Sequence, residues 1–288
     1  MTLVVAYCTD DICFMVGDTL VTHQHFELKG DLGPINGEYH SLKIQILNGA
    51  LAVAFAGDFD AAYSAVQALK SHLYTNPNID PVIWLSQQEG LSGCEFLVLV
   101  NQKEKRLFLV RNDELFECRR AYIGSADDYK RYTVLRKEYA GPDERQVVAA
   151  DGKQLRLPVT DGEKEFDIVS DAMEALSRDL VGKKYQLVGA VSGFVTRVAD
   201  ARTSKELEYL QSVEISSQPW EPAGGYSVLA DNTDTRGLGI YFRAGGRGFV
   251  FPVCGTPPCV PSGADSLSAF IQEAHDRWGM KLVGGTWP

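Results

Sequence analysis

The fold of this chain is decided near its start, where two runs rich in β-forming residues follow one another: Thr2-Leu-Val-Val-Ala-Tyr7 and Ile12-Cys-Phe-Met-Val-Gly17. Their β-branched and aromatic side chains favour extended backbone. The polar residues Thr9-Asp10-Asp11 between them are typical of a tight turn. The pattern predicts an antiparallel hairpin at the N-terminus, and strand character this early predicts a chain without a targeting leader.

A second strand pair is expected after a polar, Gly-rich segment at 24–39. The apolar runs 42–47 and 51–56 flank Asn48-Gly49, a dipeptide that favours hairpin turns. A helix should follow from Asp58, because apolar residues then recur at spacings of three and four. Those residues are Phe59, Ala62, Val66, Leu69 and Leu73.

The middle of the chain predicts more strands and then two further helices. Three consecutive strands are expected at 95–100, 106–110 and 115–123, after a weaker helical stretch around Trp84. One helix should span 126–140, and the next should carry Phe166, Val169, Met173, Leu176 and Leu180 on one face. Residues 185–198 are expected to return to strand.

The tail from 201 to 288 is expected to form a separate extension on a core at 1–200. It contains a predicted hairpin, 226–230 with 238–253, whose tip is Ala244-Gly-Gly-Arg-Gly248. A short helix is expected near 266–277. The hairpin is too apolar to stand alone in water, so it should cover another surface.

Strand pairs that alternate with helices predict an α+β fold in which two antiparallel sheets pack face to face between helices, a four-layer αββα sandwich. Five short motifs occur in this order: Thr2-Leu-Val-Val, Gly17-Asp18, Ser41-Leu-Lys-Ile44, Ala54-Phe-Ala-Gly-Asp58 and Ile123-Gly-Ser125. In this order they resemble proteasome β-subunits and their bacterial relatives, which are N-terminal nucleophile (Ntn) hydrolases. The resemblance covers about the first 200 residues.

Thr2 is the candidate nucleophile. Removal of Met1 would leave a hydroxyl and a free α-amine on one residue, and an amine of unperturbed pKa about 7.7–8.0 is a usable base at neutral pH. The resemblance implies that Asp18 orients a catalytic lysine, for which Lys43 is the natural partner. An ammonium near Thr2 would lower the proton affinity of its amine, while Asp18 would offset the desolvation of the lysine. A surface lysine on a strand edge is the plainer alternative for Lys43.

Three further positions take catalytic roles only by the resemblance. Gly57 would supply an oxyanion-binding N–H, although it also suits a strand-to-helix turn. Ser125 would help to hold the terminal amine, although it equally suits a helix cap. Asp179 matches the last polar element of the family, but Gly182 stands where a serine is expected, and Ser192 offers a different alignment.

Composition narrows the possible partners. The net charge is -10 and the sequence pI is about 5.0, with no stripe of Lys and Arg for a nucleic-acid backbone. The six cysteines are scattered without the spacing of a zinc site, and no apolar run approaches the ~18 residues of a membrane span. We therefore expect a cytoplasmic protein with no nucleic-acid or membrane partner and no metal or organic cofactor.

These features together predict a threonine-type amidohydrolase, a proteasome-like peptidase that acts on a peptide or amide substrate through an acyl-enzyme. A small-molecule amidase or acylase on the same fold is an alternative, because substrate pockets lie on loops. A non-catalytic assembly subunit is the alternative from a different class. The resemblance also implies a homo-oligomer.

Overall fold

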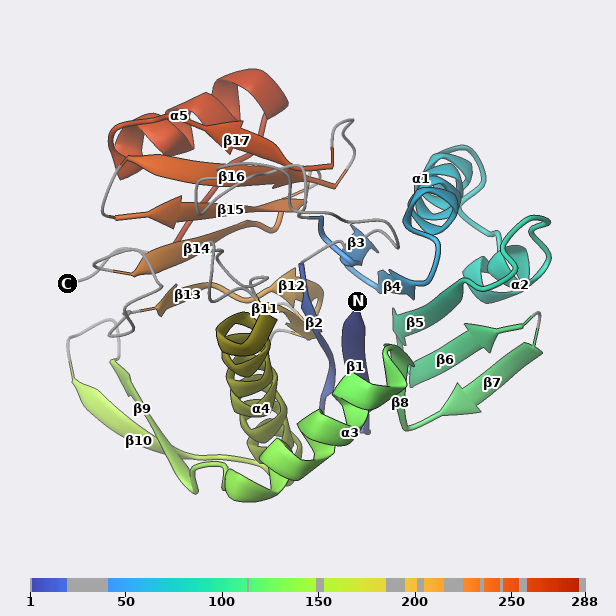
Figure 1. The fold of residues 1–288 in the computed structure, drawn as a ribbon, viewed down its shortest axis with the longest axis horizontal. Helices are drawn as coiled ribbons and strands as arrows, with labels where there is room; N and C mark the ends of the chain where they lie inside the picture. The colour runs from blue at the N-terminus through green and yellow to red at the C-terminus, as the bar shows by residue number, and fades with distance from the viewer. Residues whose placement is uncertain are drawn as a thin grey trace.

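The computed structural model describes most of the chain. The described residues are 2–19, 41–112, 114–148, 153–184, 195–200, 205–214, 225–233, 236–243, 246–253 and 258–284, without the side chains of 147–148, 177–184 and 213–214. They form a mixed α+β structure with several antiparallel sheets (Figure 1).

The first sheet is built around the predicted N-terminal hairpin. Its five strands lie in the order β12-β11-β2-β1-β8. Their bounds are Leu3–Cys8 for β1, Cys13–Asp18 for β2, Arg120–Gly124 for β8, Val195–Asp200 for β11 and Leu207–Tyr209 for β12. In the hairpin Val4 lies opposite Gly17 and Cys8 lies opposite Cys13. This register brings Asp18, at the end of β2, back beside the start of β1.

The second sheet follows chain order, β3-β4-β5-β6-β7. Its strands are Ile44–Asn48 for β3, Leu51–Ala56 for β4, Glu95–Asn101 for β5, Lys105–Arg111 for β6 and Glu114–Cys118 for β7. The single strand predicted at 115–123 is wrong, because the chain breaks at Arg119: β7 ends the second sheet and β8 joins the first. Propensity alone does not reveal this change of sheet, since both halves are β-rich.

Four helices lie on the outer faces of these two sheets. They are α1 (Phe59–Thr75), α2 (Pro81–Ser86), α3 (Ala126–Leu135, extended by a 3-10 turn, Arg136–Glu138) and α4 (Asp161–Lys184). The predicted start of α1 is confirmed, because the Asp58 side chain accepts from the backbone N–H of Ala61. None of the helices in the described segments is long and apolar enough to cross a membrane.

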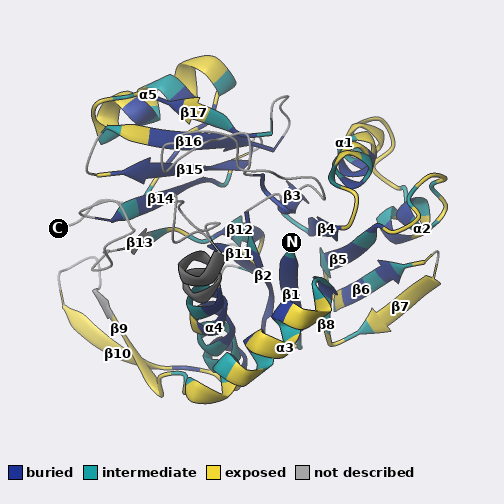
Figure 2. Ribbon diagram, viewed as in Figure 1, coloured by how far each residue is buried: buried dark blue, intermediate teal, exposed yellow. Residues whose placement is uncertain are grey.

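The central strands of these sheets are buried along nearly their whole length (Figure 2), and their alternate side chains belong to different buried clusters. Between the two sheets, Val4, Ala6 and Met15 share one buried cluster with residues of β4 and β5, among them Ala52, Ala54, Leu97 and Leu99. The opposite face of the second sheet packs on α1 and α2. The opposite face of the first sheet packs on α3 and α4. Burial on both faces of each sheet fixes the strand register, because a slip of one residue would exchange the two faces.

The tail forms a third sheet, more than the predicted hairpin. Its order is β13-β14-β15-β16-β17, with bounds Ser212–Glu214, Tyr226–Asp231, Gly237–Phe242, Arg247–Pro252 and Val260–Ser262. One face adds Ile240, Phe242 and Phe249 to the cluster between the first two sheets. The other face packs on α5 (Leu267–Trp278). The apolar strands of the tail are therefore buried on both faces.

A small hairpin outside these sheets was not predicted. Strands β9 (Glu144–Val148) and β10 (Gln154–Pro158) form a two-stranded sheet within a segment whose sequence is mostly polar. Every residue of β10 is exposed, so the hydrophobic pattern gave no signal for it.

Candidate active site

Thr2 lies at the start of β1, between the ends of β2 and β8. Figure 1 places this end of the strand beside β4 of the second sheet. The backbone carbonyl of Thr2 accepts a hydrogen bond of 2.7 Å from the N–H of Ser125. The next residue, Leu3, donates its N–H to Asp18 Oδ1 at 2.9 Å. The backbone on both sides of the Thr2 side chain is therefore held by neighbouring strands.

Gly124 makes the contact between β8 and Thr2 possible. Its φ of 97° lies in the left-handed region, where a side chain is strained. A Cβ atom at this position would lie 2.0 Å from the Thr2 carbonyl oxygen. The N–H of Gly124 donates to Glu95 Oε2 at 2.7 Å. Only glycine allows β8 to end this close to Thr2.

Asp18 and Lys43 form the ion pair that the sequence suggested. Lys43 Nζ lies 2.7 Å from Asp18 Oδ2, and the two side chains are 2% and 19% exposed. Lys43 comes from the segment before β3, so the pair links the second sheet to the end of β2. Burial lowers the pKa of Lys43, and the neighbouring Asp18 carboxylate opposes that shift. The surface-lysine alternative is excluded, because this lysine is inside the protein.

The same carboxylate connects the lysine to the strand that bears Thr2. One oxygen of Asp18 accepts from Lys43 and the other accepts from the N–H of Leu3. The end of β2 is held on its far side as well, since Thr196 Oγ1 donates to the Gly17 carbonyl at 3.1 Å. The position of Lys43 relative to β1 is thus fixed through one well-anchored carboxylate.

Gly57 ends β4 with a φ of 100°, also in the left-handed region. A Cβ atom there would lie 2.1 Å from the Gly93 carbonyl oxygen, so a tight turn requires glycine. Asp58 then caps α1. This geometry bears out the turn and cap interpretation, and an N–H at a helix start can also bind an anion.

Ser125 is observed as the cap of α3. Its Oγ accepts from the N–H of Asp128 at 3.2 Å, while its own N–H holds Thr2. Asp179 belongs to α4, but its side chain lies outside the described residues, as do Ser192 and the whole segment 20–40 with His23 and His25. The structure brings together Thr2, Asp18, Lys43 and Ser125 around the start of β1.

Glu95 is a polar residue at this site that the sequence argument missed. It begins β5 directly opposite Ala56, the residue before Gly57, and its carboxylate accepts the N–H of Gly124. It also pairs with Arg111 across the sheet. Glu95 thereby links the turn at Gly57 to the turn beside Thr2. The sequence did contain one sign of this role, because Glu95 is a lone carboxylate directly before the apolar run Phe96-Leu-Val-Leu-Val100.

The arrangement offers a hydroxyl at a strand end, a buried lysine with a carboxylate partner, and a backbone N–H at the Gly57 turn. Such groups serve acyl transfer to a hydroxyl nucleophile. In the described segments, no group of three or more His, Cys, Asp or Glu side chains is placed to hold a metal ion.

Comparison with known proteins gives a limited result. No protein-family model matches the chain, and no curated protein matches it. Among solved structures, it is similar to eukaryotic HslV from Trypanosoma brucei, with a TM-score of 0.43 and 14% identity over 69% of this chain and 98% of that chain.

Proposed function

We propose that this chain is an N-terminal threonine amidohydrolase, a peptidase of the Ntn type, in which Thr2 becomes the nucleophile once Met1 is removed. The observation that carries the proposal is the Asp18 carboxylate, which accepts from buried Lys43 with one oxygen and from the Leu3 N–H with the other. Burial of Lys43 beside the strand that bears Thr2 costs free energy and lowers the pKa of the lysine. Groups whose pKa is shifted in this way are concentrated at functional sites.

In the proposed reaction Thr2 Oγ attacks the carbonyl carbon of an amide, and the free α-amine takes the hydroxyl proton. The Gly57 N–H would stabilise the oxyanion. The C–N bond then breaks, the leaving nitrogen takes the proton from the α-amine, and an ester remains on Thr2. Water, deprotonated by the same amine, hydrolyses the ester and restores the hydroxyl. Lys43 would keep the proton affinity of the amine low, and Asp18 would hold Lys43 in place.

Two further residues would support the reaction. Ser125 would act through its backbone N–H, and Asp179 would orient the amine. The core at 1–200 would form the four-layer αββα sandwich, supported by the burial of both faces of the first two sheets. Residues 201–288 would be an extension packed on that core, apart from β12, which is an edge strand of the first sheet. We further propose a cytoplasmic homo-oligomer that needs no cofactor.

Intact-mass spectrometry combined with an epoxyketone probe tests the function. The probe forms its full adduct only with a hydroxyl and a free amine on the same residue. We expect the mass of a chain without Met1, and one adduct that maps to Thr2. Retained Met1 with no adduct would overturn the proposal and favour a non-catalytic subunit. An adduct on Thr2 without turnover of peptides would keep the nucleophile and favour a small-molecule amidase.

A further inference from the structure

Two free cysteines face each other at the end of β1 opposite Thr2. Cys8 ends β1 and Cys13 begins β2, and the two are direct partners in the strand register. The N–H of Cys8 bonds to the Arg119 carbonyl, and the N–H of Cys13 bonds to Asp200 Oδ1. Neither N–H joins the two residues, so they form a non-hydrogen-bonded pair, in which Cα atoms lie ~4.5 Å apart. Disulfides span Cα distances of about 4.4–6.8 Å.

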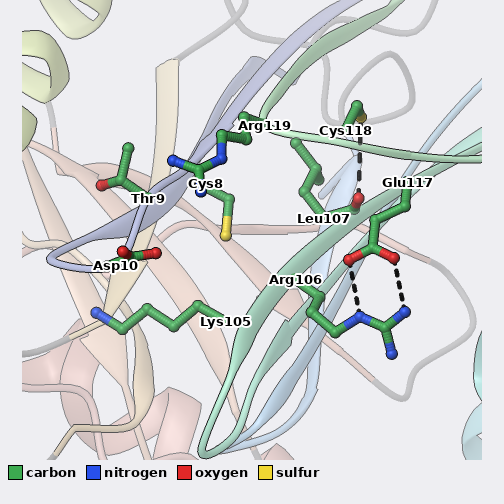
Figure 3. Close-up of a pocket in the computed structure, with 9 residues that line it drawn as sticks. All are labelled: Cys8, Thr9, Asp10, Lys105, Arg106, Leu107, Glu117, Cys118 and Arg119. Carbon is green, nitrogen blue, oxygen red and sulfur yellow. Dashed lines mark hydrogen bonds and ion pairs between the residues drawn. The ribbon is translucent and has the colours of Figure 1, made fainter.

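One of the two sulfurs faces a pocket. Cys8 lines a hollow of about 410 Å³ together with Lys105, Arg106, Arg119 and Cys118, and Figure 3 shows its side chain among these residues. Cys13 does not line this pocket and is fully buried beside it. Of the Cys8–Cys13 pair, only Cys8, whose exposed fraction is 4%, can therefore be reached from the pocket.

The surroundings of Cys8 favour its thiolate. A hydrogen bond from Cys13 lowers the pKa of Cys8, burial and the Asp200 carboxylate oppose this, and the charges of Lys105 and Arg119 lower it further. Lys105 Nζ lies 2.7 Å from Asp200 Oδ2, close to the turn that joins β1 to β2. By contrast, burial raises the pKa of Cys94, which lies on the α1 side of the second sheet.

We propose that Cys8 and Cys13 form a thiol oxidation site, in which Cys8 is oxidised by a hydroperoxide that enters the pocket and Cys13 then closes a reversible disulfide across the hairpin. The inference is independent of the hydrolase proposal, because none of its residues lies at the Thr2 end of β1.

The two steps balance in atoms and electrons. The Cys8 thiolate attacks one peroxide oxygen, the O–O bond breaks, and the leaving oxygen departs as water or an alcohol after it takes a proton. Cys8 is then a sulfenic acid. The sulfur of Cys13 attacks the sulfur of Cys8, the S–O bond breaks, and hydroxide leaves with the Cys13 proton as water. Two thiols lose two electrons and the hydroperoxide gains them; an external thiol reverses the reaction.

Peptide mapping after treatment with hydrogen peroxide tests the proposal on the full chain. A protease that cleaves before aspartate cuts ahead of Asp10, Asp11 and Asp18, so it separates Cys8 from Cys13. After free thiols are blocked, and without reduction, we expect the peptide ending at Thr9 to be linked to the peptide 11–17. Dithiothreitol should release the two peptides.

Two sets of variants sharpen the result. Cys13→Ala should leave a Cys8 sulfenic acid that dimedone traps, whereas Cys94→Ala should form the Cys8–Cys13 link as the wild type does. Lys105→Met should slow the link by up to about tenfold, because loss of a nearby cation reduces the thiolate fraction. Arg106→Met is the matched control: it lines the same pocket but pairs with Glu117, and should change the rate by less than about twofold.

Three outcomes would overturn the proposal in a chain that circular dichroism shows to be folded. They are the absence of the linked pair, a link from Cys8 to Cys118, and oxidation of Cys94 as fast as that of Cys8.

Discussion

The two ends of strand β1 carry the same arrangement of groups with different burial. At the Thr2 end, Asp18 accepts the N–H of Leu3 at 2.9 Å and Lys43 Nζ at 2.7 Å. At the Cys8 end, Asp200 accepts the N–H of Cys13 at 2.9 Å and Lys105 Nζ at 2.7 Å. In each case an aspartate of the first sheet holds the hairpin and a lysine from the second sheet.

The difference lies in the exposure of the lysines. The side chain of Lys43 is 2% exposed and that of Lys105 is 18% exposed. Full burial lowers the pKa of Lys43, as its carboxylate partner only partly compensates for lost water. An aspartate–lysine ion pair therefore links the two sheets at both ends of β1. Only at the Thr2 end is the lysine fully buried, as the proposed role of Lys43 requires.

The largest effect is expected for Thr2→Ala. Loss of the nucleophile should reduce amide hydrolysis by at least about a thousandfold, while the free energy of unfolding changes by less than about 1 kcal/mol. Thr9→Ala is the matched control, because Thr9 is the threonine that follows the other end of β1. Initial rates on a fluorogenic peptide measure both. Equal rates for Thr2→Ala and wild type would rule out Thr2 as the nucleophile.

The next largest effect separates the two lysines. Lys43→Ala should lower kcat/KM by about a hundredfold or more and destabilise the protein by about 3 kcal/mol, because Asp18 is left without this cation. Lys43→Arg should not restore activity, since a guanidinium cannot replace the compact ammonium. Lys105→Ala should keep the hydrolytic rate. The comparison fails if both alanine variants lose activity equally.

Local signals were enough to predict the hairpin at Thr2 and the helix that Asp58 starts, because both depend on residues close in sequence. The pairing of Asp18 with Lys43 was expected only from the resemblance, because the two residues are far apart in sequence, and Asp18 ends a strand of the first sheet whereas Lys43 precedes a strand of the second. The break at Arg119 and the contacts of Glu95 depend on which sheet a strand joins. That choice is made by packing across many residues, so neither propensity nor alternation reports it.

Gly124→Ala tests the close approach at the Thr2 end. A Cβ would meet the Thr2 carbonyl oxygen at 2.0 Å, and the residue has a φ of 97°. We expect a loss of about 2–4 kcal/mol in the free energy of unfolding by urea. Gly90→Ala separates the two causes, because Gly90 has a φ of 80° with nothing near its Cβ position. A similar loss in both variants would assign the cost to backbone strain alone.

The lowered pKa of Lys43 predicts a pH dependence of stability. Between the folded pKa and the ordinary value of 10.5, the unfolded chain holds a proton that the folded chain has released. The contribution of Lys43 to stability should therefore rise with pH through that window and level off above it. The free energy of unfolding, compared between wild type and Lys43→Met from pH 7 to 11, isolates this contribution. A constant difference would show that burial does not shift this lysine.

The smallest expected effect concerns Ser125, whose side chain and backbone N–H bind different partners. Its Oγ caps α3 through the Asp128 N–H at 3.2 Å, and Ser266 caps α5 through the Ala269 N–H at the same distance. Ser125→Ala and Ser266→Ala should therefore each lower the free energy of unfolding by about 1 kcal/mol. Since the Ser125 N–H to the Thr2 carbonyl survives the substitution, Ser125→Ala should lower kcat/KM only a few-fold, within about tenfold. A loss far beyond that, with the stability change matching Ser266→Ala, would instead mean that the hydroxyl itself holds the terminal amine.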